Sequence, residues 1–258
     1  MSFGRGAGLL RFGIAPAGGT AVNPPVCVRY TLHKTDAALA AIAKALGRKL
    51  PPPEWVQPRF NVTLTHVMPV VATAADGPEV RAMMWGLVPF YAQHQPRTQL
   101  LHNAKSETAA TLPSFRQAVA QRRCLVPANG FYEWLTQGKL KRPHLFTRRD
   151  EEPFAFAGLW EPAVDDRPET YCILTTRPND LVAPIHTRMP VLLTQTTMPR
   201  WLGSEPLSTD AYRELTEPLP ADRMQVREVS RFMSNSRNEG PQCLEPPEAA
   251  PPPEPELF

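Results

Sequence analysis

The sequence predicts an α+β fold built around a strongly curved sheet. Segments rich in β-forming residues follow one another, and helical patterns separate only some of them. The 31 prolines among 258 residues are about 12% of the chain, against roughly 5% in average proteins. That frequency favours short extended segments and turns over long helices. Regular alternation of strand and helix is absent, which argues against a Rossmann-type fold.

The first helical pattern follows Thr35, a candidate N-cap, and ends at Gly47. Leu39, Ile42 and Leu46 recur at helical spacing and therefore share one face. That face is expected to pack against the sheet.

Further elements follow in order along the chain. A second helix is predicted over Pro113–Arg123, with Phe115 and Val119 on its inner face, and two shorter helices near 196–202 and 209–216. The predicted strands are His66–Thr73, Arg81–Val88, Cys124–Leu135, Phe154–Trp160, Tyr171–Thr176 and Met189–Thr194.

The chain is predicted to divide into three parts. Residues 1–26 are rich in Gly, Ala and Pro without a helix or strand period, which indicates an unstructured extension. Residues 27–240 form one domain, and residues 241–258, with four Glu and no Lys or Arg, form a disordered tail rich in Pro and Glu. The central part holds 26 basic and 21 acidic residues, a mildly basic balance that permits a phosphate-bearing partner.

Several classes of protein are excluded by what the sequence lacks. No run approaches the roughly 18 uninterrupted apolar residues of a membrane helix, and the first 30 residues lack a secretory signal. The four cysteines, Cys27, Cys124, Cys172 and Cys243, show no CxxC spacing and no paired His spacing, so no zinc or other metal site is expected. A reduced cytoplasm, with free thiols, is the expected compartment.

Five short segments place polar or charged residues in apolar, strand-like surroundings. They begin at Cys27, Leu101, Asn129, Ile185 and Val229. Burying such groups without partners costs roughly 1–3 kcal/mol each. Several of them together therefore indicate a polar site at the mouth of a barrel or sheet.

Taken singly, four residues of these segments have plainer interpretations. Glu133 could lie on the solvent face of an alternating strand, and His186 could be a satisfied loop histidine. Asn103 could be a turn residue, and Cys27 could be a small buried hydrophobe. None of the four is specific by itself.

Taken together and in order, the segments resemble those of the SRAP family (SOS response-associated peptidases, abasic-site processing proteins). The resemblance covers about residues 27–240. The matching motifs are Val26-Cys-Val-Arg-Tyr30, Arg59-Phe-Asn-Val62, Trp85-Gly-Leu-Val-Pro89, Asn103-Ala-Lys-Ser-Glu-Thr108, Gly130-Phe-Tyr-Glu-Trp134 and Ile185-His-Thr-Arg-Met-Pro190. Lys105 departs from the family, which often has Arg there, and Lys loses the bidentate fork.

The resemblance implies a single domain with a curved, mostly antiparallel or barrel-like sheet and peripheral helices. It also implies a function: covalent capture of abasic sites in single-stranded DNA, without a cofactor, by a bacterial, nucleoid-associated monomer with replication-fork proteins as further partners. By resemblance Cys27 is the nucleophile, Glu133 the acid/base group, Asn103 orients the amine or sugar, and His186 assists ring opening.

The resemblance also implies a set of DNA contacts. The polar and basic residues expected there are Arg29, Asn61, Lys105, Arg188, Arg231 and Arg237. An apolar wedge that stacks on or splays bases is expected from Trp85, Pro89, Phe90 and Tyr91.

The implied chemistry requires Cys27 to be an N-terminal residue, because only a free α-amine can form a Schiff base and then a thiazolidine. Two routes can produce it. Either the Val26–Cys27 bond is cleaved autocatalytically, or translation begins at position 26 on a GTG codon and the initiator Met is removed. We expect the second.

Two other functions stay open at this point. The chain could be a thiol peptidase acting on other proteins, with Cys27 and His186 as nucleophile and base. It could also be a non-covalent binder of single-stranded DNA.

Overall fold

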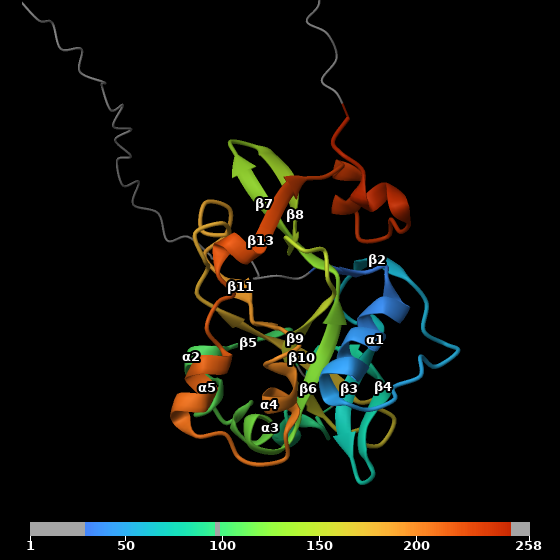
Figure 1. Cartoon of the computed structure of the whole chain (residues 1–258), viewed down its shortest axis with the longest axis vertical. Helices are drawn as coiled ribbons and strands as arrows, with labels where there is room; N and C mark the ends of the chain where they lie inside the picture. The colour runs from blue at the N-terminus through green and yellow to red at the C-terminus, as the bar shows by residue number, and fades with distance from the viewer. Residues whose placement is uncertain (1–28, 96–98, 249–258) are drawn as a thin grey trace, which may run out of the picture.

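The computed structural model describes residues 29–95 and 99–248 (Figure 1). Its strands are β1 (Tyr30–Leu32), β2 (Arg59–Val62), β3 (Val67–Ala74), β4 (Gly77–Trp85), β5 (Asn103–Lys105), β6 (Arg123–Ala128), β7 (Gly130–Gln137), β8 (Leu140–Arg148), β9 (Phe154–Glu161), β10 (Thr170–Thr176), β11 (Met189–Pro190), β12 (Leu192–Leu193) and β13 (Met224–Glu228). The α-helices are α1 (Thr35–Leu46), α2 (Ser106–Ala109), α3 (Arg116–Gln121), α4 (Met198–Leu202) and α5 (Thr209–Leu215), and the 3-10 turns are η1 (Phe90–Ala92), η2 (Ala221–Arg223), η3 (Arg231–Ser234) and η4 (Pro241–Leu244).

Five strands close into a ring. The order in this sheet is β10-β4-β3-β6-β9, and β9 pairs back to β10 through Tyr171–Trp160 and Cys172–Leu159. Most pairs are antiparallel, while β10 runs parallel to both β4 and β5. The predicted α+β class with a barrel-like core is confirmed.

Three of the ring strands, β6, β9 and β10, are buried on both faces, which explains their nearly continuous apolar sequences. In β10, Tyr171 and Ile173 belong to the cluster inside the ring, while Cys172 and Leu174 belong to the outer cluster. Successive strand residues point to opposite faces, so a single strand contributes to both clusters. Helices cover the outer cluster; Leu39 of α1 packs there with Trp201 of α4 and Phe115, which precedes α3.

A second sheet, ordered β13-β8-β7-β1-β2, lies above the ring in Figure 1. The chain passes from the ring to this sheet at Asn129, which separates β6 from β7. Asn129 N donates to Thr31 O at 2.8 Å, and its Oδ1 accepts from Lys34 N at 2.8 Å. Next to it, a Cβ on Gly130 would lie 2.8 Å from Phe146 O, so the close approach of β8 requires glycine there.

The predicted helices and strands differ from the structure at several boundaries. Thr35 is the first helical residue of α1, and Lys34 occupies the N-cap, so the predicted cap was wrong by one position. Gly47 ends this helix with φ 61°, as predicted. The second helix is shorter than Pro113–Arg123, because Arg123 already belongs to β6.

Other differences concern strands. The predicted strand Cys124–Leu135 is two strands that join different sheets. Strands β1, β2 and β5, which have three or four residues each, were not predicted. Strands β8 and β13 were not predicted either, because charged residues interrupt their apolar pattern. The folded part also continues beyond Gly240: η4 follows, and Cys243 within it is fully buried. The start of the predicted tail at residue 241 is therefore too early.

No helix among the described residues has the length and apolar character needed to cross a membrane.

Candidate functional site

Glu133 lies on β7 with only 3% of its surface exposed, so the interpretation as a solvent-facing strand residue is wrong. It shares a strand face with Phe131, which packs in the cluster inside the ring. The preceding residue, Tyr132, donates its backbone N–H to Arg29 O at 3.1 Å. Glu133 is therefore held on a strand that pairs directly with the beginning of β1.

Asn103 and Lys105 lie on β5, where they pair with β10 in parallel register. Ala104 between them belongs to the outer, helix-covered cluster, so both residues face away from it. Asn103 is half-buried and Lys105 is exposed. The carbonyl of His102 accepts from Trp85 Nε1 at 2.9 Å, which fixes the start of this strand against the ring.

His186 lies half-buried in the loop before β11. Its Nδ1 lies 3.1 Å from Arg188 N and 3.2 Å from Arg188 O, and its backbone N donates to Val182 O. Burial lowers the pKa of His186 below its usual 6.5, and the hydrogen bond to Arg188 opposes that shift. The imidazole is therefore mostly neutral at pH 7, which leaves it able to accept or donate a proton.

Arg188 and Glu107 form a bidentate ion pair with N–O distances of 2.6 and 2.7 Å. Arg188 Nη2 also donates to Thr175 O at 2.6 Å. The hydrogen bond from Arg188 holds the pKa of Glu107 below its usual value. This fork joins the segment that carries Asn103 to the loop that carries His186. Sequence reasoning missed Glu107, although its place inside the Asn103–Thr108 motif was a usable signal.

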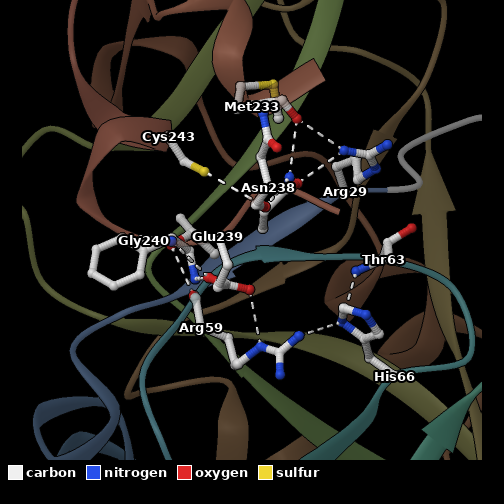
Figure 2. A network of polar contacts seen from close by, with 12 residues as sticks. Arg29, Arg59, Thr63, His66, Met233, Asn238, Glu239, Gly240 and Cys243 are labelled. Atoms are coloured by element: carbon white, nitrogen blue, oxygen red, sulfur yellow. Dashed lines mark hydrogen bonds and ion pairs between the residues drawn. The ribbon is translucent and has the colours of Figure 1, made fainter. Parts of the chain in front are cut away.

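Arg29 binds the C-terminal segment rather than pointing freely into solvent (Figure 2). Its Nη1 donates to Asn61 Oδ1 at 2.9 Å and to Met233 O at 3.0 Å. The guanidinium also lies 5.8 Å from the ring centroid of Trp134, within cation–π range. Burial lowers the pKa of Arg29 from its usual 12.5, and the group still carries its charge at pH 7.

A second arginine contacts the same segment. Figure 2 shows Arg59 between Glu239 and His66: its Nε lies 3.1 Å from Glu239 Oε2 and its Nη2 3.1 Å from His66 Nδ1. Burial and the nearby Arg59 charge lower the pKa of His66. The beginning of β2 is thereby tied to the chain that follows η3.

The predicted DNA-contact residues fall into two groups. Asn61, Trp85 and Pro89 are buried, and the first two are completely covered, so Asn61 and Trp85 present no surface to bases or phosphates in this structure. Phe90 and Tyr91 are 42% and 53% exposed. The cations Lys105, Arg231 and Arg237 are also exposed.

Cys27 and Val26 lie outside the described residues. The other three cysteines are buried free thiols. Burial raises the pKa of each of them, that of Cys243 to about 11. Since the thiolate is the nucleophile, none of these three is a reactive candidate. Within residues 29–95 and 99–248, no group of three or more His, Cys, Asp or Glu side chains could hold a metal ion.

Known proteins resemble this chain in sequence. The family model described as SOS response associated peptidase (SRAP) matches residues 26–236. The "Abasic site processing protein YoqW" of Bacillus subtilis is 33% identical over 200 residues, covering 76% of this chain and 89% of that protein. The "Abasic site processing protein YedK" of Escherichia coli is 26% identical over 86% of this chain and 100% of that protein.

Solved structures show the same fold. A crystal structure of a protein from Bacteroides thetaiotaomicron superposes with a TM-score of 0.73 at 26% identity, covering 85% of this chain and 99% of that one. A protein from Bordetella bronchiseptica superposes with a TM-score of 0.64, also at 26% identity, over 79% of this chain and 100% of that one. The chain therefore belongs to the SOS response-associated peptidase (SRAP) family.

Proposed function

We propose that this protein processes abasic sites in single-stranded DNA by forming a covalent thiazolidine crosslink through Cys27, acting as the first residue of the mature chain. The observation that carries the proposal is the burial of Glu133 on the strand that pairs with the chain just after Cys27. A buried carboxyl beside a nucleophilic amine suits the proton transfers of Schiff-base chemistry. The names of the relatives, which are abasic site processing proteins, support the same substrate.

The reaction balances without a cofactor. The α-amine of Cys27 adds to the aldehyde of the ring-opened sugar and expels its oxygen as water, giving an imine. The thiol sulfur then bonds to the imine carbon and the thiol proton moves to the nitrogen, which closes a five-membered ring. The reference pKa of an α-amine is about 7.7–8.0, so an appreciable fraction is neutral and nucleophilic at pH 7.

Three side chains are assigned to this reaction. Glu133 delivers the proton that lets the hydroxyl leave as water. Asn103 orients the amine or the sugar from the edge of β5. His186, neutral because burial lowers its pKa, exchanges a proton with the sugar hydroxyl during ring opening.

The DNA strand is held by charge and stacking. Lys105, Arg231 and Arg237 offer exposed cations for phosphates, a contact independent of sequence. Arg29 and Arg188 were also predicted to hold phosphates, but their guanidinium groups bind Asn61 and Glu107 in the protein. Phe90 and Tyr91 provide the exposed aromatic surface on which a base can stack. Single-stranded DNA is favoured because its lesion reaches a pocket without the cost of unpairing.

The reaction needs a free amine on Cys27. Hydrolysis of the Val26–Cys27 bond supplies it and leaves a carboxylate on Val26; initiation at position 26 followed by removal of Met supplies it as well. A GTA, GTC or GTT codon at position 26 would exclude the second route. N-terminal sequencing of the native protein identifies the residue that carries the amine.

A denaturing gel tests the proposed function. The protein with Cys27 as its first residue is mixed with a single-stranded oligonucleotide that contains one abasic site. We expect a heat-stable shifted band that is lost completely in Cys27→Ala. Binding without this band would instead indicate a non-covalent DNA binder. Cleavage of casein without the band would indicate a thiol peptidase that acts on other proteins.

A further inference from the structure

We propose that Asn61 is a positioning residue for the crosslinking reaction. It acts through Arg29, which it joins to residues 231–244, a segment that we call the clasp. This inference rests on the proposed function and deepens it. It gives Asn61 a role inside the protein in place of the predicted contact with DNA, since Asn61 has no exposed surface.

The side chain of Asn61 is fully used inside the protein. Its Nδ2 lies 3.0 Å from Met233 O, 3.0 Å from Asn235 O and 2.9 Å from Asn238 O. Its Oδ1 accepts from Arg29 Nη1 at 2.9 Å. One amide with no exposed surface thus holds three carbonyls of the clasp and one arginine. A carboxylate cannot match all four partners, since an amide combines a donor with an acceptor and a carboxylate only accepts.

Arg29 is fixed at both its side chain and its backbone. The guanidinium binds Asn61 and the carbonyls of Met233 and Ser234. The backbone carbonyl accepts from Tyr132 N, one residue before Glu133. Arg29 therefore couples the position of β7 to that of the clasp. It does so only two residues after Cys27 in the chain.

The clasp is itself anchored at several further points. Trp134 Nε1 donates to Ser234 Oγ at 3.1 Å, Phe60 N donates to Glu239, and Cys243 is fully buried against the strands. Figure 2 shows the clasp residues Met233, Asn238 and Glu239 gathered around the two arginines. Asn61 is the residue of this network that bonds to both Arg29 and three clasp carbonyls.

A nucleophile acts efficiently only when it is held in the right geometry. A displacement of about 1 Å can lower a rate roughly 10²-fold. We therefore expect Asn61→Ala to reduce the crosslinking rate constant at saturating DNA by about 10- to 100-fold. Non-covalent affinity should fall by a smaller factor than the rate constant, because Lys105, Phe90 and Tyr91 lie outside the clasp and stay in place, while only Arg231 and Arg237 move with it.

The test compares three measurements on wild-type, Asn61→Ala and Asn61→Asp proteins, each confirmed to begin at Cys27 and to extend to Phe258. The first is the crosslinking rate at saturating abasic oligonucleotide. The second is affinity for an oligonucleotide with a tetrahydrofuran analogue, which has no aldehyde. The third is the reaction with glycolaldehyde, a small aldehyde that needs no positioning. Asn61→Asp keeps an acceptor for Arg29 but loses the donors to the clasp, so its rate should fall between the other two.

Arg123→Lys is the matched control. Arg123 is another buried arginine bonded to backbone carbonyls, among them Trp201 O at 2.7 Å and Val119 O at 2.8 Å, but it lies at the opposite end of β6 from Asn129. It should lower stability and leave the crosslinking rate unchanged.

The proposal is supported if Asn61→Ala loses rate on DNA but reacts with glycolaldehyde like the wild type. It is overturned if Asn61→Ala crosslinks at the wild-type rate, or if Arg123→Lys loses as much rate as Asn61→Ala does. Failure of the wild type to crosslink would instead overturn the proposed function.

Discussion

The closed ring and the second sheet differ in the kind of side chain that they bury. Ring strands such as β10 present apolar residues to both faces. The second sheet, in contrast, buries Glu133 on β7 and Asn61 on β2 and binds the clasp through Arg29. The ring is stabilised mainly by apolar packing, and its buried charged residues, Glu161 and Arg123, lie at the ends of β9 and β6. The second sheet carries buried polar groups that must each keep a partner, as expected where a protein places chemistry.

The largest expected effect distinguishes a core residue from a residue of the contact surface within one short segment, residues 85–90. Trp85 is completely buried and packs 5.3 Å, centroid to centroid, from Tyr30. Trp85→Ala should lower the free energy of unfolding by about 3–5 kcal/mol, the usual cost of a large aromatic deletion in a core. Chemical denaturation measures this loss.

Phe90→Ala is the counterpart, because Phe90 is 42% exposed. Its stability should stay within about 0.5 kcal/mol of the wild type, while its affinity for single-stranded DNA falls by about 1–3 kcal/mol. Equal stability losses in the two variants would contradict the distinction between core and contact surface.

The next effect concerns two buried carboxylates, one in each region. Glu133→Gln should slow crosslinking about 10²-fold, because the amide cannot donate the proton that the leaving hydroxyl needs. Binding to the tetrahydrofuran oligonucleotide should be retained. The rate is read from a time course on denaturing gels.

Glu161→Gln is the control for this prediction. Glu161 is 1% exposed on β9 and pairs with Arg122 at 2.9 Å. Burial raises its pKa, so the neutral amide suits this position and the crosslinking rate should not change. An unchanged rate in Glu133→Gln would exclude the assigned role of Glu133.

The smallest effect concerns the fork between Glu107 and Arg188. Glu107→Gln loses the charge-assisted pair that joins the Asn103 segment to the His186 loop, and crosslinking should slow about fivefold. Because the pKa of Glu107 is lowered, its stabilising contribution is present above the unfolded pKa and is lost as pH falls through the lower folded value. Rates at neutral pH therefore report on the intact fork.

A second fork supplies the control. Arg200 and Glu214 join α4 to α5 with the same N–O distances of 2.6 and 2.7 Å. Glu214→Gln should leave the rate unchanged. A loss of rate in both variants would show that such forks act through general stability rather than through His186.

The sequence predicted the helices and strands that are determined by interactions between neighbouring residues in the chain. The helix over α1 followed from the spacing of Leu39 and Ile42 and from the glycine stop at Gly47. The α+β class followed from the run of strand-like segments, and the order of the motifs indicated the family. The N-cap of this helix was harder to assign between Lys34 and Thr35, since helix boundaries are uncertain by one or two residues.

Contacts between distant segments were decided only by the tertiary structure. No local pattern distinguishes Trp85, which faces the ring interior, from Phe90, which is exposed, because both are aromatic residues of one short segment. Asn61 and Arg29 both looked like DNA ligands, yet their hydrogen-bonding groups meet carbonyls roughly 170 to 200 positions later in the chain. A residue type determines which partners it can have, and only the fold determines which of them come within reach. By itself, therefore, the sequence determined the class of fold and the type of chemistry, while the tertiary structure decided which polar residues lie on the surface and which hold the site together.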